Sequence, residues 1–350
     1  MTSPFSSAER IAWVDAAKGI CIILVVMMHA TLGLGEAVER EGWMHVVVAF
    51  AKPFRMPDFF LVSGLFLGRA ITRDWRTFAD RRIVHFLYFY GLWYVIQFAL
   101  KGWSLAGGDP VEFVRLFALG FIEPFGTLWF IYMLAVYSVT VKLLQRLPPL
   151  VLLAGAAALQ IAHVESGWLV IDAFCAYFVY FVAGYVFATR VFAIAAWAGR
   201  NALPALVGLA FWASVNGFAA FAPSSFAGQT VASLPGVSLI LGLAGAVAIT
   251  TVAALLTSRG WAGPLAYCGE RSLVVYLAFF LPMAATRAIL VKTGLVDAVG
   301  VGWGAALVTA AAVVIPLVFE RLVRGTVLDF LFVRPGACHI AAPARLAQAG

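Results

Sequence analysis

Charged residues are scarce in this chain. Only 12% of its 350 residues are Asp, Glu, Lys or Arg, whereas 63% are hydrophobic. A soluble globular protein has about twice this charged fraction. Long apolar runs separate the few charges, which excludes a soluble Rossmann or barrel enzyme, and the runs do not alternate as a transmembrane β-barrel requires. The sequence therefore predicts an all-α, polytopic integral membrane protein.

Metal-binding and redox motifs are also missing. None of the four cysteines belongs to a CxxC pair or a zinc-type cluster, so we expect no metal and interpret the first three cysteines as small core residues. No internal repeat is visible, so the inverted-repeat signature of many transporters is absent. All loops are short. We therefore expect one transmembrane domain over residues 1–333 and a loosely ordered cytoplasmic tail at 334–350, which is rich in alanine.

About ten membrane-spanning helices are predicted from the apolar runs. Each run has about 20 residues, the length that crosses the hydrocarbon core of a bilayer. The expected spans are residues 12–34, 44–68, 83–101, 124–144, 148–164, 168–189, 202–222, 234–256, 265–290 and 300–320.

The distribution of positive charge indicates orientation in a membrane. The net charge of +7 arises from Lys and Arg residues that gather in alternate loops, whereas the first opposite loop carries Glu36, Glu39 and Glu41. Such alternation follows the positive-inside rule, so we expect no nucleic-acid partner and place both termini in the cytoplasm. The expected location is a bacterial-type cytoplasmic (inner) membrane, with membrane lipids as partners.

Three ionisable residues share one face of the first span. Lys18 precedes His29 by eleven residues, which is about three helical turns and roughly 16 Å, and Asp15 lies one turn before Lys18. An ionisable residue at the depth of His29 normally faces the interior of a helix bundle and marks a site. Neutral imidazole is a plausible general base. The alternatives are a histidine satisfied by an interhelical hydrogen bond and a lysine that only snorkels to the interface.

The second span holds a charged pair beside a proline. Pro57 is expected to free a carbonyl one turn earlier and to kink the helix. Arg55 and Asp58 are three residues apart and are expected to pair. They form either part of a site or an internal staple, in which Ser63 and the glycine after it allow close helix packing.

Two further groups of residues are candidates for binding. Arg81 and Arg82 belong to a basic cluster between the second and third spans, which either grips an anionic ligand or sets topology and meets anionic lipid. Trp129 belongs to a set of span aromatics that either line a pocket or pack within the membrane.

Together these motifs resemble the membrane acyltransferase-3 family. The resemblance rests on a basic residue separated by ten residues from a histidine, Lys18 and His29, and on Met-Pro-x-Phe-Phe-x-x-Ser-Gly at 56–64. It covers about residues 10 to 320. Weaker matches lie at 81–83, 126–130, 181–185 and 269–276.

The chain departs from the family pattern at three positions. The family usually has arginine in the place of Lys18, and lysine keeps the charge but loses the bidentate fork. Members often have histidine where this chain has Phe279, three residues after Tyr276. Asp58 stands where an apolar residue is more usual. These departures indicate a divergent branch.

The resemblance implies a fold of about ten spans and a specific reaction. Members move acyl groups onto sugars or other extracytoplasmic acceptors. The implied function is transfer of an acyl group, such as acetyl, from cytoplasmic acyl-CoA as co-substrate to a hydroxyl of an extracytoplasmic or lipid-linked glycan. His29 is then the catalytic base or a transient acyl carrier, while Lys18 orients the donor or pairs with Asp15.

The remaining candidates take binding roles on the same interpretation. Arg55 and Asp58 hold or polarise the site beside His29. Ser63 and Trp129 are assigned to the substrate site, and Arg81 and Arg82 to the phosphates of CoA.

Two other interpretations stay open from the sequence. One is a non-catalytic transporter or flippase, with a proton or substrate pathway through Lys18, His29, Arg55 and Asp58. The other is a catalytically inactive relative, because Phe279 replaces the usual histidine.

Overall fold

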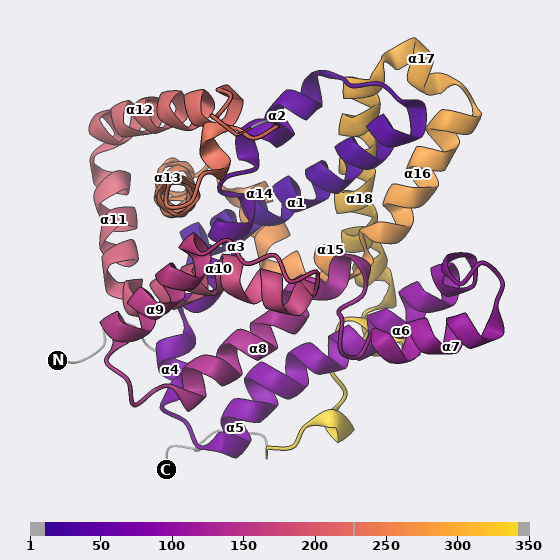
Figure 1. Ribbon diagram of the computed structural model, residues 1–350, viewed down its shortest axis with the longest axis horizontal. Coiled ribbons are helices and arrows are strands. Elements are labelled where there is room, and N and C mark those ends of the chain that lie inside the picture. The colour runs from indigo at the N-terminus through magenta and orange to yellow at the C-terminus, as the bar shows by residue number, and fades with distance from the viewer. Residues whose placement is uncertain (1–10, 227, 342–350) are drawn as a thin grey trace.

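A computed structural model describes residues 11–226 and 228–341 and consists of helices (Figure 1). Within this part of the chain no strand forms beyond a single isolated bridge, so the prediction of an all-α membrane protein is confirmed. The α-helices are α1 (Ala12–Val38), α2 (Trp43–Ala51), α3 (Arg55–Gly64), α4 (Leu67–Ile71), α5 (Trp75–Ala79), α6 (His85–Leu105), α7 (Pro110–Leu119), α8 (Trp129–Leu143), α9 (Pro149–Ile161), α10 (Leu169–Val186), α11 (Ala188–Arg200), α12 (Ala202–Phe221), α13 (Val237–Ser258), α14 (Gly263–Glu270), α15 (Ser272–Ala278), α16 (Phe280–Lys292), α17 (Leu295–Val299) and α18 (Val301–Val323). The other turns are the π-helical η1 (Asp80–Val84) and the 3₁₀ turns η2 (Gly126–Leu128), η3 (Val231–Ser233), η4 (Val327–Leu331) and η5 (Gly336–Cys338).

The number of spanning helices is smaller than the ten predicted. Seven described helices are long and apolar enough to cross a membrane, and an eighth results if α15 and α16, which bend by 53°, are one span. Two of the predicted spans are shorter or broken in the structure. The span expected at 148–164 is α9, which has 13 residues, and the span expected at 44–68 is divided into α2, α3 and α4.

Helix α1 lies at the centre of the bundle and packs against α3, α13, α14 and α18. Its contact with α14 is backbone on backbone. A Cβ atom on Gly19 would lie 2.1 Å from the carbonyl oxygen of Leu265, and one on Gly269 would lie 1.7 Å from that of Asp15. Small residues at such crossings allow helices to approach closely within a membrane. The start of α1 is thereby held firmly in place.

The second predicted span breaks where proline chemistry predicts. Pro57 has no N–H for the carbonyl of residue 53, and the chain leaves helical geometry between α2 and α3, one turn before Pro57. Pro57 itself lies in the first turn of α3, where its missing donor costs little. The break makes Arg55 the first residue of α3 and places Asp58 in its first turn.

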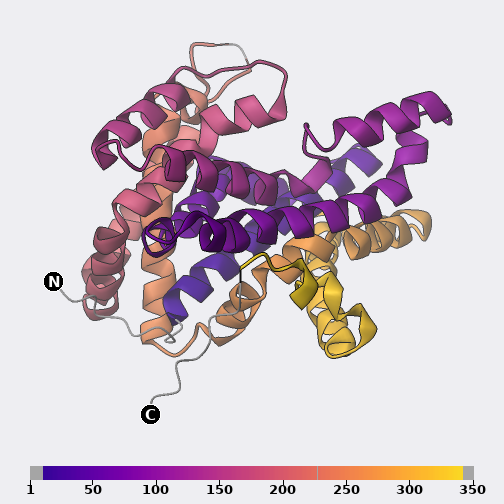
Figure 2. The same ribbon diagram turned by 90° about the horizontal axis from the view of Figure 1, so that it is seen from below.

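The bundle has two distinct ends, which Figure 2 displays at top and bottom. We call the end that carries α14 and the first turn of α1 the proximal end. The distal end carries the connection 222–236, at the top of Figure 2, together with the C-terminal end of α1 and the α9–α10 connection.

The segment after α18 returns to the proximal end and is bound there. Arg334 is 8% exposed, and its guanidinium donates to the Asp80 carboxylate at 2.7 Å and to the Asp80 carbonyl at 2.6 Å. The backbone N–H of Ile340 donates to the same carboxylate at 2.8 Å, and His339 Nδ1 lies 3.3 Å from it. Residues 334–341 are therefore not the loosely ordered tail that their composition predicts, because their partner lies on a distant helix. Residues 342–350 lie outside the described residues.

Candidate active site

The predicted ion pair at the start of α1 is present. Lys18 Nζ donates to Asp15 Oδ1 at 3.3 Å, with the two side chains 32% and 17% exposed. The same ammonium lies 6.0 Å from the ring centroid of Phe66, which follows α3. Helical spacing brings residues 15 and 18 together, and the tight α1–α14 crossing fixes the turn that carries them.

His29 lies eleven residues further along α1, half-buried, with its ring against Phe279. The two ring centroids are 5.6 Å apart. Among the described residues, no side chain or carbonyl forms a hydrogen bond with the imidazole, so the interhelical hydrogen bond of the structural interpretation is not formed there. Phe279, the residue that replaces the usual histidine of the family pattern, is therefore a direct neighbour of His29.

Two basic side chains from other helices, Arg55 of α3 and Lys101 of α6, lie close enough to His29 for their charges to act on the imidazole. Lys101 Nζ lies 3.5 Å above the ring of Phe280, and Arg287 is the cation next to Lys101. The guanidinium of Arg287 donates to the carbonyl of Gly33 on α1 at 3.2 Å. Positive charge thus gathers around the distal half of α1.

The predicted pairing of Arg55 with Asp58 is wrong. In the described part of the chain neither forms an ion pair: both carboxylate oxygens of Asp58 are buried without a hydrogen-bond partner, as are Nε and Nη1 of Arg55. Asp58 is fully buried in the core of the bundle. The i,i+3 rule applies to neighbours on one helix surface, but Asp58 faces the core while Arg55, at the helix start, faces a cavity.

Two predicted substrate-binding residues have different surroundings. Ser63 donates its hydroxyl to the carbonyl of Phe59 at 2.7 Å, one turn back in α3. The next residue, Gly64, packs against α10, where an added Cβ would lie 2.1 Å from the carbonyl oxygen of Phe181. These contacts favour the interpretation of Ser63 as part of a close helix packing and not of a substrate site. Trp129, in contrast, lines a cavity at the distal end.

The two candidate donor-binding arginines lie near the proximal end. Arg82 donates to the carbonyl of Phe66 at 3.2 Å and is partly buried, whereas Arg81 is exposed. Since Lys18 also approaches Phe66, Lys18 and Arg82 flank the same aromatic residue. The structure thus brings Arg82 close to Lys18 and keeps both away from the cavities at the distal end.

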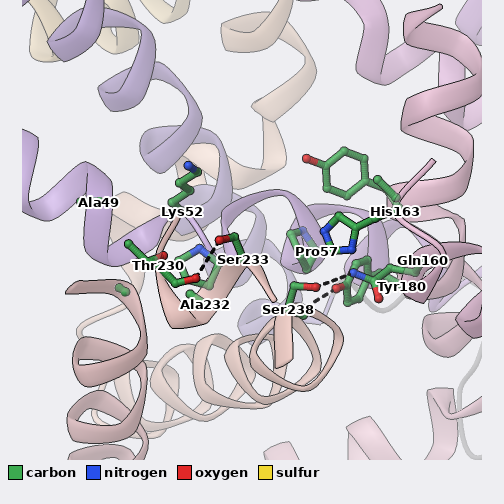
Figure 3. A pocket seen from close by; sticks show the side chains of 14 residues that line it. Ala49, Lys52, Pro57, Gln160, His163, Tyr180, Thr230, Ala232, Ser233 and Ser238 are labelled. Atoms are coloured by element: carbon green, nitrogen blue, oxygen red, sulfur yellow. Dashed lines mark hydrogen bonds between the residues drawn. The ribbon is translucent and has the colours of Figure 1, made fainter. Parts of the chain in front are cut away.

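Three adjoining cavities open at the distal end. The first, of about 450 Å³, is lined by Lys52, Arg55, His45 and Glu41. The second, of about 240 Å³, shares Lys52 with the first and has His163 among its opposite lining residues, with Pro57 between them (Figure 3). The third, of about 390 Å³, shares His163 and Tyr177 with the second and reaches Trp129.

Hydrogen bonds tie the floor of the second cavity to α13. Gln160 Nε2 donates to the hydroxyl of Ser238 at 2.8 Å, and the phenol of Tyr180 donates to the carbonyl of Ser238 at 3.2 Å (Figure 3). Helices α9, α10 and α13 are thereby held together beneath the opening. Within residues 11–226 and 228–341 no group of three or more His, Cys, Asp or Glu side chains is placed to hold a metal ion.

Sequence reasoning missed several residues of the candidate site, on the His29 side and in the distal cavities. Arg287 had a usable signal, because it is an ionisable residue inside the predicted span 265–290. Lys101 ends the predicted third span and reads as an interfacial lysine. Tyr177 gave no signal, since aromatic residues are common in every span.

Comparison with known proteins identifies the family of the chain. The acyltransferase domain of the acyltransferase-3 family matches residues 11–321. The inner membrane protein YcfT of Escherichia coli (strain K12) is 28% identical over 185 residues, which are 46% of this chain and 51% of YcfT. The match thus spans about half the length of that relative. No solved structure matches the chain significantly. Residues 11–321 include the whole of the site from Asp15 to Arg287, and the chain belongs to the acyltransferase-3 family of membrane proteins.

Proposed function

We propose that the protein transfers an acyl group from acyl-CoA at the proximal end to a hydroxyl of an extracytoplasmic or lipid-linked glycan at the distal end. The observation that carries the proposal is the environment of His29. Its imidazole makes no hydrogen bond to another described residue and stands near two cations, Arg55 and Lys101. Of these, Arg55 also lines the first distal cavity. Family membership supports the reaction class.

The proposed chemistry balances through one proton. His29 takes the proton of the acceptor hydroxyl while the hydroxyl oxygen forms a bond to the thioester carbonyl carbon. The carbon–sulfur bond then breaks, and the leaving CoA thiolate receives the proton from the imidazolium. Negative charge develops on the carbonyl oxygen in between, and Arg55 and Lys101 are the cations that would stabilise it. In the alternative route, a nitrogen of His29 bonds to the carbonyl carbon as the carbon–sulfur bond breaks, and the CoA thiolate takes the ring proton; the acceptor oxygen then bonds to that carbon as the carbon–nitrogen bond breaks, and the hydroxyl proton goes to the imidazole.

Donor binding is proposed for the proximal end, which on this proposal faces the cytoplasm. Lys18 and Arg82 flank Phe66, and Arg81 stands exposed close by on η1. These cations suit the phosphates of CoA. The rise from Lys18 to His29 is roughly 16 Å, which the pantetheine arm must cross to bring the thioester to the imidazole.

Two measurements test the proposal. Purified protein in lipid nanodiscs, given acetyl-CoA and an extract of cell-envelope glycans, should release free thiol. Mass comparison of surface glycans and lipids from cells with and without the protein should reveal one lost acyl increment, which identifies donor group and acceptor together. Absence of both signals would contradict the acyltransferase assignment. Solute or lipid movement in that case would favour the transporter interpretation.

A further inference from the structure

The three distal cavities adjoin one another through shared lining residues, and together we call them the groove. The first and second share Ala49 and Lys52, and the second and third share His163 and Tyr177. One half of the groove is basic and the other half is aromatic. A ligand that occupies both halves must carry a charged group and an apolar surface within one molecule.

The aromatic half offers a stacking surface. Trp129 and Tyr177 have ring centroids 5.6 Å apart, and Phe60 stacks beneath Tyr177 with centroids 5.5 Å apart. The rims beside these rings are polar, with Gln160 and His163 among the residues that line both neighbouring cavities. Flat apolar surfaces with a few fixed polar groups suit a sugar ring, which has an apolar face and a rim of hydroxyls.

The basic half has cations without partners. Among the residues the structure describes, Lys52 forms no ion pair and is exposed, while Nε and Nη1 of Arg55 are buried without an acceptor. Glu41 is the acidic residue of this cavity and is exposed at its edge. In the aromatic half, Asp172 already accepts a hydrogen bond from Ser166 at 2.7 Å. Two cations against one exposed carboxylate leave the basic half positive.

Arg55 joins this groove to His29. It lines the first cavity and is also one of the two cations that act on the imidazole. A guanidinium binds carboxylate and phosphate groups in a fixed fork geometry. An anionic sugar that pairs with Arg55 would therefore be held at the part of the groove that is nearest in charge to His29.

We infer that the acceptor is an anionic glycan, with its carboxylate or phosphate group at Lys52 and Arg55 and a neighbouring sugar ring on Trp129 and Tyr177. This inference rests on the proposed function only in treating the groove as the acceptor site. The anionic group supplies the acceptors that the orphaned guanidinium lacks, and its position selects which hydroxyl is acylated.

The test is a binding measurement without acyl-CoA, so that it does not depend on turnover. Protein in nanodiscs of zwitterionic lipid is titrated with three oligosaccharides of matched length: one neutral, one with a hexuronate and one with a phosphorylated hexose. We expect at least one of the anionic sugars to bind roughly tenfold more tightly than the neutral sugar, because a charged hydrogen bond contributes about that factor. The carboxylate and phosphate arms identify which group is preferred. Equal affinity for all three sugars would overturn the inference.

Variants assign the preference to the groove. Arg55→Gln and Lys52→Gln should each reduce the anionic preference severalfold, whereas Arg55→Lys should keep part of it. Lys292→Gln removes an exposed lysine that does not line the groove and should leave the preference unchanged. A melting temperature for each variant checks the fold. Preference retained in a folded Arg55→Gln variant would overturn the assignment.

Two further results separate this inference from the proposed function. Inorganic phosphate alone should bind much more weakly than the phosphorylated sugar, and equal binding would refute the role of the aromatic half. Selective binding of anionic glycans without thiol release from acetyl-CoA would refute acyl transfer and leave the binding inference intact. Acyl transfer to neutral and anionic glycans at equal rates would support acyl transfer and refute the inference of an anionic acceptor.

Discussion

The two ends of the molecule differ in how far their buried polar groups have hydrogen-bond partners within the chain. At the proximal end, Asp80 accepts bonds from Arg334 and from the N–H of Ile340, and Lys142 Nζ donates to the carbonyls of Ile71 and Arg73 at 2.5 and 2.8 Å. The Asp80 carboxylate and the Lys142 ammonium are satisfied by the chain itself, as stable packing requires of buried polar groups, although Nε of Arg334 is buried without a partner among the described residues.

The distal half leaves equivalent groups without partners. Within the described residues, Arg55 has two buried nitrogens without an acceptor, and Asp58 has two buried oxygens without a donor. His29 likewise makes no hydrogen bond to another described residue. A protein retains such costly groups where a ligand or a reaction uses them. The contrast therefore assigns structure to the proximal end and chemistry to the distal half.

The largest effect on stability is expected at the proximal end. Arg334→Ala leaves the Asp80 carboxylate buried and uncompensated, which should lower the free energy of unfolding by about 3–5 kcal/mol. The measurement is detergent-induced or thermal unfolding of the purified protein. Arg115→Ala is the matched control, because Arg115 and its partner Glu112 are 63% and 34% exposed, and such a surface pair is worth at most about 1 kcal/mol. Equal losses in the two variants would remove the distinction between this cluster and an ordinary surface pair.

The largest effect on rate is expected at His29. His29→Gln should lower acyl transfer by about 100-fold or more, since it removes the general base, and should leave unfolding nearly unchanged because no described residue bonds to the ring. His85→Gln makes the same change at a histidine near the proximal end and should retain activity. A well-folded His29→Gln variant with near-normal transfer would return His29 to a packing role.

Local rules predicted the elements of this contrast that depend on neighbours in sequence. Helical spacing placed Asp15 beside Lys18, and the proline rule located the break before α3. Apolar run length identified the membrane class, but not the number of spans, because the spans predicted at 148–164 and 44–68 are short or broken and the span predicted at 265–290 is bent between α15 and α16.

Features that depend on distant residues could not be predicted in the same way. Arg334 lies in an alanine-rich terminus, and its partner is 254 residues earlier in the chain. The direction of Asp58 depends on how α3 is rotated after the break, which no local pattern specifies. The grouping of Arg55, Lys101 and His29 likewise arises from the packing of three helices, although each residue is visible in the sequence as a charge or an imidazole in or beside a span.

A smaller effect is expected at Lys18, which has a partner within the chain and also lies at a proposed binding site. Lys18 is paired like a structural residue, yet it is 32% exposed and lies beside the proposed donor site. Lys18→Met should lower the rate roughly tenfold, because a hydrogen bond to a charged group is worth about 1.5–3 kcal/mol, whereas Lys18→Arg should keep most of it. The readout is the initial rate against acyl-CoA concentration. Equal rates in Lys18→Met and the parent protein would mean that the ammonium only snorkels.

The smallest expected effect is the coupling between Arg55 and Asp58. Since no ion pair joins them, the losses from Arg55→Gln and Asp58→Asn should add to within about 0.5 kcal/mol in a double-mutant cycle, measured on both unfolding and rate. Asp58→Asn alone removes no hydrogen bond to a described residue and should change stability little, whereas Arg55→Gln should act on rate through His29. A coupling of several kcal/mol would mean that the two charges pair. Arg55 would then have a partner within the chain, as Asp80 and Lys142 have at the proximal end.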